Sequence, residues 1–340
     1  MLNAKRSSQW AQKQIRQKEN MRKTTSLDAT GFIGLGIMGE GMAARLMSVQ
    51  VAGTPENPLL IWNRSIEKCH EFKAKFSEEN DLTRKHCIEI MDSPQAVVAK
   101  SRIVYSMLST PEASRSVFEG DNGVLKGVHD KSMLIDCATL AEADMTRMSR
   151  AVVAKGGKFM EAPVSGSKVP AAQGTLIFLC AGSETIYNDA EVQRGLTAMG
   201  KASHFLNDSV GFGTRAKLVV NSLMATMLAT YSESLTLTEK MGLDPSKMID
   251  IIGQGAVNCP MFALKGPKML VHDHAPNFPL KHALKDIKLA VDMANDNKVE
   301  FSINKMACQL FEKANDGKTY KLSDEDFSAI HEVIQKESSC

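Results

Sequence analysis

The chain has 340 residues, of which 43% are hydrophobic and 24% are charged, and its formal net charge is +2. This length allows two domains with a sizeable core, and the composition is ordinary for a soluble globular protein. The best apolar run, Leu218 to Thr230, is interrupted by polar residues. Because a membrane-spanning helix needs about 20 consecutive apolar residues, no membrane span is expected.

The charge is unevenly distributed. Residues 1–30 hold seven Lys/Arg and two Asp/Glu, whereas the other 310 residues hold 34 basic and 37 acidic groups. A slightly acidic body argues against nucleic-acid binding by the fold itself. Residues 1–29 are basic and lack a periodic apolar face, which indicates a disordered tail and a cytoplasmic protein. A cleaved mitochondrial or plastid presequence is the alternative.

The cysteines and histidines favour no metal centre. Seven cysteines, an odd number without Cys-x-x-Cys spacing, are typical of reduced and mostly buried intracellular thiols. His272 and His274 are potential ligands, but no third ligand follows at a convincing spacing. We therefore expect a polar surface loop there and no metal.

A glycine-rich motif follows the first apolar segment. It reads Gly34-Leu35-Gly36-Ile37-Met38-Gly39, and a helical pattern begins at once. This is Gly-x-Gly-x-x-Gly between a strand and a helix, the context of a dinucleotide fingerprint. The first glycine permits a tight turn, the second admits the pyrophosphate, and the third lets the helix pack on the strand. The motif predicts a nucleotide site whose phosphates meet the helix N-terminus.

The second predicted strand, Leu59 to Trp62, ends at Asn63-Arg64-Ser65. Sites that prefer NAD usually place Asp or Glu here, where a carboxylate binds the ribose hydroxyls. Asn63 is neutral, and the planar guanidinium of Arg64 suits a phosphate. The pattern predicts NADP(H), with NAD(H) as the alternative if Arg64 only stacks on the adenine.

Further strands and helices alternate along this half. Strands are expected over 102–108 and 132–136, with a helix opened by Ser93-Pro94 between the second and third strands, which predicts a parallel α/β sheet. Ligands of such sheets lie beyond the carboxyl ends of the strands, where Leu108, Ser109 and Thr139 fall. Thr139 also suits a helix N-cap.

Two connections in this half, 48–58 and 76–91, are long enough to predict surface insertions. A later strand beginning at Lys158 leads into the turn Ser165-Gly166-Ser167, whose amides and hydroxyls suit a carboxylate unless the turn is an ordinary loop. Another buried strand is expected within 174–182.

After Gly213 the pattern is helical. Lys217 and Asn221 lie four residues apart and therefore share one face of a mostly apolar helix, which requires a polar partner opposite. Lys285-Asp286 enters a second amphipathic helix. The helices are expected over 214–241, 245–254, 281–296, 301–315 and 324–336.

Together, these motifs resemble those of the β-hydroxyacid dehydrogenases over residues 30–335. This family includes 3-hydroxyisobutyrate dehydrogenase and the glyoxylate/succinic semialdehyde reductases. The resemblance implies a Rossmann-like parallel-sheet domain (30–208) and an all-α domain (209–336), joined by a long interdomain helix. It also implies an active site in the cleft between the domains and a homodimer or homotetramer.

The resemblance assigns roles to matching positions. Gly211-x-Gly213-x-x-x-Lys217-x-x-x-Asn221 matches the catalytic segment, which makes Lys217 the general acid that protonates the substrate oxygen and Asn221 its catalytic partner. Substrate contacts are expected from Ser165, Gly166, Ser167, Phe278 and Asp286. Cofactor contacts are expected from Gly34, Leu35, Gly36, Ile37, Met38, Gly39, Asn63, Arg64, Ser65, Leu108, Ser109, Thr139 and Lys285.

One departure from the family pattern selects a branch. Much of the family has Ser-Gly-Gly where this chain has Ser165-Gly166-Ser167, and segments 258–262 and 278–282 look more like the glyoxylate/succinic semialdehyde reductases. The implied reaction is NADPH-dependent reduction of a small aldehyde acid. An NAD(P)-dependent 3-hydroxyisobutyrate dehydrogenase and a non-catalytic NADP-binding assembly protein are the alternatives.

Overall fold

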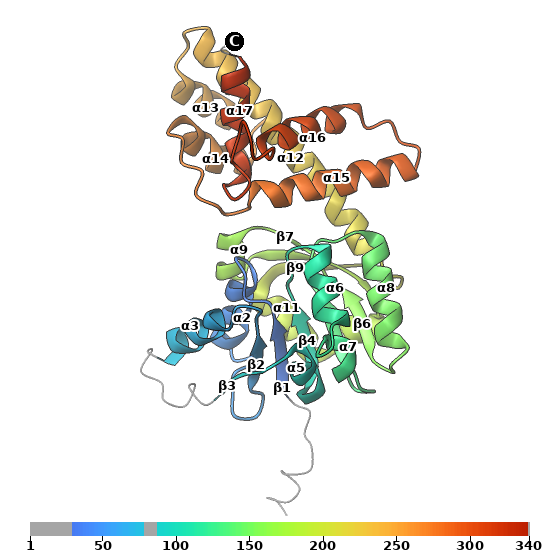
Figure 1. The fold of residues 1–340 in the computed structure, drawn as a ribbon. Helices are drawn as coiled ribbons and strands as arrows, with labels where there is room; N and C mark the ends of the chain where they lie inside the picture. The colour runs from blue at the N-terminus through green and yellow to red at the C-terminus, as the bar shows by residue number, and fades with distance from the viewer. Residues whose placement is uncertain (1–28, 78–86, 339–340) are drawn as a thin grey trace, which may run out of the picture.

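The computed structural model describes residues 29–77 and 87–338 (Figure 1). The tail or presequence expected at the N-terminus thus lies almost entirely outside the described residues. A sheet-containing half is followed by a helical half, and one long helix rises from the first into the second (Figure 1). The fold class predicted from the sequence is confirmed.

Nine strands form one sheet in the order β3-β2-β1-β4-β5-β6-β8-β7, with β9 paired to β8. Pairing is parallel from β3 to β6, whereas β8 runs antiparallel to β6 and β7. The strand order reverses on either side of β1, which places a ligand crevice between the carboxyl ends of β1 and β4. The strands are β1 (Ala29–Ile33), β2 (Leu59–Trp62), β3 (Ile88–Ile90), β4 (Ser101–Ser106), β5 (Met133–Asp136), β6 (Lys158–Glu161), β7 (Val164–Ser165), β8 (Leu176–Gly182) and β9 (Gly200–Asn207).

Helices cover both faces of this sheet, which explains the continuous apolar runs of its strands. Neighbouring side chains enter opposite cores: Phe32 and Tyr105 belong to one buried cluster, Ile33 and Val104 to another. The helices are α2 (Gly39–Ser48), α3 (Ile66–Ser77), α5 (Pro94–Lys100), α6 (Pro111–Glu119), α7 (Val124–Gly127), α8 (Glu142–Val153), α9 (Lys168–Gln173), α10 (Glu184–Tyr187) and α11 (Ala190–Met199).

The helical half packs around the upper part of α12, where Leu228, Leu235, Ile287 and Phe311 share a third core. It comprises α12 (Phe212–Lys240), α13 (Pro245–Gln254), α14 (Pro260–Leu270), α15 (Leu280–Asp296), α16 (Ser302–Ala314), a short 3-10 turn (Phe327–Ala329) and α17 (Ile330–Glu337). Sequence reasoning did not anticipate α14, which contains Pro267. Among the described residues, no helix has the length and apolar character to cross a bilayer.

Two expectations need correction. Thr139 does not cap a helix, because α8 starts three residues later with Ala141 at its N-cap. The segment 76–91 is not solely an insertion, because Ile88–Ile90 forms the edge strand β3 beside β2; residues 78–86 lie outside the described residues. With only three residues, Ile88-Glu89-Ile90 is too short for its alternation to predict a strand.

A buried carboxylate anchors α12 to the sheet. Glu161, at the end of β6, is fully buried and accepts hydrogen bonds from the backbone N–H groups of Gly211 (2.6 Å), Gly213 (2.8 Å) and Thr214 (3.3 Å) and from the Thr214 hydroxyl (2.6 Å). These donors are the unpaired groups at the positive end of the helix, where a carboxylate is stabilising. Burial raises the pKa of Glu161, and the Thr214 hydrogen bond opposes that rise.

Gly213 allows this close approach. A Cβ at position 213 would lie 2.3 Å from the backbone oxygen of Leu179 in β8, and Gly211 has a φ of 114°. The Gly-x-Gly pair that precedes Lys217 therefore has a packing role in this structure: it brings the helix N-terminus against β6 and β8.

We predict that Gly213→Ala lowers the free energy of unfolding by about 1–3 kcal/mol, because the methyl group collides with backbone that cannot move cheaply. Gly253→Ala is the matched control, since position 253 lies in α13 and has open space around its Cβ. This variant should raise the free energy of unfolding by up to about 1 kcal/mol, because alanine favours a helix more than glycine does. Urea titration compares the two variants. Equal effects would contradict the close-packed junction.

Candidate active site

The glycine-rich turn has a different steric reason at each glycine. Gly34 has a φ of 99°, and its Cβ would lie 2.4 Å from the Met107 backbone oxygen. A Cβ on Gly39 would lie 1.9 Å from the Gly34 oxygen, so this glycine lets α2 start against the strand. Position 36 has no atom within 4 Å of its Cβ. The turn is thus packed on its protein side and open where a pyrophosphate needs room.

In the segment after β2, Asn63 holds the glycine-rich turn and Arg64 borders the crevice. Asn63 accepts a hydrogen bond from the Leu35 N–H (3.0 Å) and donates to the Ser65 backbone oxygen (3.0 Å), so it fixes the glycine-rich turn. Arg64 is exposed beside the same crevice and has no hydrogen-bond or ion-pair partner in the part of the chain that the structure describes. Lys68, one turn along, lines the crevice too and was missed by sequence reasoning.

Two adjoining clefts follow the carboxyl ends of the strands. The first, of about 600 Å³, runs over Gly34 and Arg64, and the second lies between the two halves of the molecule. Gly36, Lys68, Leu108 and Ser109 border both. The second cleft also brings together Ile37, Met38, Gly39 and Thr139 from the sheet half with Phe278, His282, Lys285 and Asp286 from the helical half. Asn277 and His282 were not predicted as site residues, although Asn277 directly precedes Phe278 and His282 follows it by four residues.

A chain of polar contacts links the halves behind this cleft. The Lys217 ammonium donates to Asn221 Oδ1 (2.6 Å), and Asn221 Nδ2 donates to Asp286 Oδ2 (2.6 Å). Lys285 pairs with Asp286 Oδ1 (2.6 Å) and also donates to the Thr139 backbone oxygen. The polar partner that Lys217 and Asn221 require is therefore Asp286 on α15.

Lys217 is a buried lysine whose pKa is lowered. Only 5% of its surface is exposed. Burial lowers the pKa of Lys217 to about 8; the Asp286 charge works against this and the Lys285 charge adds to it. Interposing Asn221 keeps the Asp286 carboxylate from direct contact with the ammonium. The side chain is thus charged near neutral pH and gives up its proton more readily than an exposed lysine.

The Ser165-Gly166-Ser167 turn lies at the end of the short strand β7. It joins β7 to α9, and these residues do not border the two clefts. The elements on either side of the turn contact the two helices that begin at the glycine-rich motifs: α9 packs on α2, and β7 contacts α12. A role in substrate binding remains a prediction.

Two buried acids near the site were also missed as functional supports. Glu161 holds α12, as described above. Asp136, at the end of β5, accepts hydrogen bonds from the Ser106 hydroxyl (2.5 Å) and the Ala138 N–H (3.0 Å), and burial raises its pKa to about 6. Asp136 thereby joins the ends of β4 and β5 just before Thr139. Both acids are the last residues of their strands, and nothing in the sequence indicates the distant groups that they bind.

Comparisons with known proteins place the chain. Residues 29–211 match the NAD binding domain of 6-phosphogluconate dehydrogenase, and residues 211–334 match the NAD-binding domain of NADP-dependent 3-hydroxyisobutyrate dehydrogenase. The chain is 38% identical over 309 residues to the chloroplastic glyoxylate/succinic semialdehyde reductase 2 of Arabidopsis thaliana (91% of this chain, 80% of the relative). It is 36% identical over 305 residues to reductase 1 of the same plant (90% and 98%).

The chain belongs to the β-hydroxyacid dehydrogenase family. Within it, the chain falls in the glyoxylate/succinic semialdehyde reductase branch. It is an NAD(P)-dependent oxidoreductase of the type that acts on CH–OH groups.

Two further similarities are more limited. The human cytokine-like nuclear factor N-PAC is 30% identical over 301 residues, covering 88% of this chain but 50% of that protein. The crystal structure of 3-hydroxyisobutyrate dehydrogenase from Salmonella typhimurium superposes with a TM-score of 0.76 over 90% of this chain and 99% of that one. Because the two sequences are only 22% identical, the similarity to the Salmonella structure shows the fold alone.

We predict that the Lys217 ammonium titrates near pH 8 in NMR spectra of ¹³C-labelled lysine, assigned with Lys217→Arg, whereas exposed lysines titrate near 10.4. Asp286→Asn removes the charge that favours the ammonium, so the midpoint should fall further. Since the unfolded chain keeps its proton to higher pH, this group makes folding more favourable as pH rises from about 8 to 10.5. A midpoint near 10 in the folded protein would contradict a buried ammonium.

Proposed function

We propose that this chain is an NADPH-dependent reductase of glyoxylate, succinic semialdehyde or both, with Lys217 as the general acid. The buried series Lys217–Asn221–Asp286, of which Asp286 borders the interdomain cleft, carries this proposal. The open space at Gly36 and the packed turn around it fit a bound dinucleotide. When bound, NADPH supplies the hydride that adds to the aldehyde carbon.

Lys217 acts on the substrate oxygen in this proposal. Negative charge grows on that oxygen as the carbonyl is reduced, and a positioned ammonium stabilises the charge and delivers the proton. Asn221 positions the lysine: its amide nitrogen is held by Asp286, which turns its oxygen toward Lys217 Nζ. Lys285 partly neutralises Asp286 and ties α15 to the end of β5 through Thr139.

The substrate carboxylate is assigned to the Ser165–Ser167 turn. Gly166 has a φ of 138°, a conformation that favours glycine, and the Ser167 side chain does not hydrogen-bond to cap α9. The contact of β7 with α12, the helix that carries Lys217, supports this assignment. Phe278, whose N–H is held by Asp326 (3.1 Å), supplies an apolar wall.

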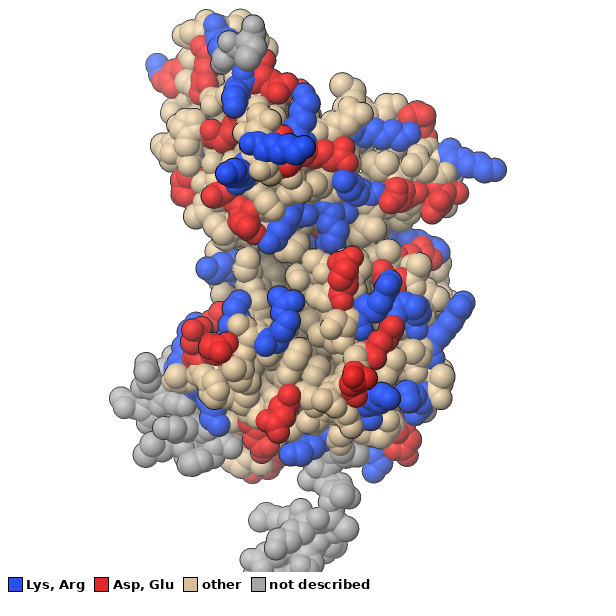
Figure 2. Space-filling model, viewed as in Figure 1, with Lys and Arg blue, Asp and Glu red and all other residues tan. Residues whose placement is uncertain are grey.

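Partners follow from the surface. Exposed apolar side chains on α12 and α16, namely Val220, Leu223, Ile303 and Met306, support a homodimer or homotetramer formed through the helical half. On the face drawn in Figure 2, basic and acidic side chains are intermixed, which supports the expectation that the fold itself does not bind nucleic acid.

The test is a reductase assay with purified protein, pairing NADPH and NADH with glyoxylate, succinic semialdehyde and methylmalonate semialdehyde. We expect turnover with NADPH and at least one of the first two, and a loss in kcat of about 100-fold or more in Lys217→Met. Exposed Lys247 on α13 provides the matched control, Lys247→Met, which should behave as wild type.

Preference for methylmalonate semialdehyde with NADH would favour the 3-hydroxyisobutyrate dehydrogenase alternative. No turnover with any aldehyde, despite dinucleotide binding, would favour a non-catalytic assembly protein. Lys217→Met retaining wild-type kcat would remove the lysine from the mechanism.

We predict that Arg64 and Lys68 set the cofactor preference, because both border the cleft where the strand after the fingerprint ends. Arg64→Ala and Lys68→Ala should each raise KM for NADPH by about tenfold, the value of one charge-assisted contact to a phosphate, and leave KM for NADH nearly unchanged. Lys126→Ala, on α7, is the control. Parallel losses with both cofactors would contradict a 2′-phosphate contact.

A further inference from the structure

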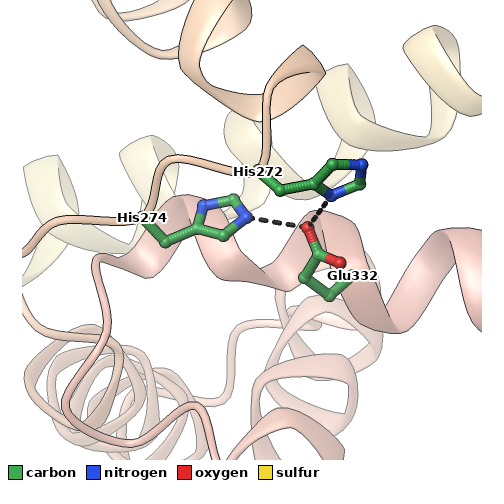
Figure 3. A group of neighbouring side chains, drawn as sticks. All are labelled: His272, His274 and Glu332. Atoms are coloured by element: carbon green, nitrogen blue, oxygen red, sulfur yellow. Dashed lines mark hydrogen bonds and ion pairs between the residues drawn. The ribbon is translucent and has the colours of Figure 1, made fainter.

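A histidine pair and a carboxylate meet in the helical half, and none of the three borders either of the two clefts described above. His272 and His274 come from the loop after α14, and Glu332 comes from α17 (Figure 3). His272 Nδ1 lies 2.7 Å and His274 Nε2 lies 2.8 Å from the same Glu332 oxygen. Glu332, the third ligand, follows His274 by 58 residues, so no short spacing in the sequence reveals it. The surface-loop expectation is wrong for His274, which is only 7% exposed.

The backbone directs both imidazoles to one point. His272 has a φ of 54°, in the left-handed region, and this turn lets two side chains separated by a single residue face Glu332 together (Figure 3). His274 Nδ1 lies 3.1 Å from the Ser328 hydroxyl. A hydroxyl at that distance can accept the Nδ1 proton and leave Nε2 with a lone pair directed at the centre of the cluster, as metal-binding histidines require.

The three ligand atoms are close enough together to be brought onto one cation. The two imidazole nitrogens and the carboxylate oxygen all lie within 4.8 Å of one another. Ligands of tetrahedral zinc, at bonds of 2.0–2.1 Å, are about 3.3 Å apart, so small side-chain rotations open the space between them.

We propose that His272, His274 and Glu332 bind a divalent transition cation of the zinc type. Two imidazoles with one carboxylate suit zinc, whereas Mg²⁺ and Ca²⁺ require oxygen ligands. His272 is exposed, which leaves a fourth position to water.

The cation stiffens the loop that leads to the cleft. It ties the start of the loop to α17, and the His274 backbone oxygen accepts a hydrogen bond from the Asp326 N–H (2.8 Å). The Asp326 carboxylate in turn holds the N–H groups of Asn277 (3.0 Å) and Phe278 (3.1 Å), which border the cleft. Binding therefore acts on residues 271–279 as a unit.

The test is calorimetric titration of the untagged, full-length chain, with its thiols kept reduced, using Zn²⁺ alone and Mg²⁺ alone. We expect one zinc per chain through this cluster, no magnesium binding, and a rise in Tm of about 4 °C at a hundredfold excess of zinc over its Kd. Amide hydrogen exchange in residues 271–279 should slow when zinc is bound. These readouts do not depend on catalysis, so failure here is distinguishable from failure of the proposed reductase.

The variants separate this cluster from other ligands, including the cysteines. His272→Ala alters an exposed side chain and should weaken zinc binding at least tenfold without unfolding the protein, and Glu332→Gln should do the same while keeping the shape of the side chain. His204→Ala, which removes an exposed histidine on β9, is the control and should bind as wild type. Equal zinc binding in wild type, His272→Ala and Glu332→Gln would overturn the proposal and leave a hydrogen-bonded cluster only.

Discussion

The position of α12, the helix that carries Lys217, depends on one buried carboxylate. Glu161 binds the free N–H groups at the start of α12, Gly211 adopts the positive φ of this turn, and glycine at position 213 removes the side chain that would keep the helix away from β8. Lys217 follows five residues after the helix begins, and a helix rises about 1.5 Å per residue, so its backbone lies less than two turns from this anchor. A lysine so close to a fixed end has little freedom to drift. The placement of Lys217 thus depends on a helix cap formed by residues outside the Lys217–Asn221–Asp286 series.

Much of the fold follows from local pattern. The strands β1 and β4, the Ser93 cap and the glycine-rich turn each depend on neighbouring residues, and the sequence predicts them. The contacts that complete the site join residues far apart in the chain. Asn221 meets Asp286 across 65 residues, and Glu161 meets Gly211 across 50. No periodicity encodes such pairs, and for Lys217 and Lys285 the resemblance to a family supplied the roles.

Local reasoning failed for the same physical reason elsewhere. Asp136 looked like the polar end of a strand, yet it links two strand ends, because its partner Ser106 is brought beside it by parallel pairing. His274 looked like part of a surface loop until α17 covered it. In each case a polar residue was interpreted from its neighbours in sequence, whereas its burial was decided by an element that the sequence places elsewhere.

Two buried lysines of the helical half show how geometry separates chemistry from structure. Lys265, on α14, pairs directly with the Asp326 carboxylate at 2.6 Å and holds the loop that carries Phe278. Lys217 is equally buried, but its ammonium donates to the neutral amide of Asn221 at 2.6 Å. The carboxylate of Asp286 is reached only through that amide. A direct ion pair would hold the proton firmly, because loss of the ammonium would leave a buried carboxylate unpaired. With Asn221 between the two charges, Lys217 is oriented while burial keeps its pKa low, which is the property that the proposed general acid requires.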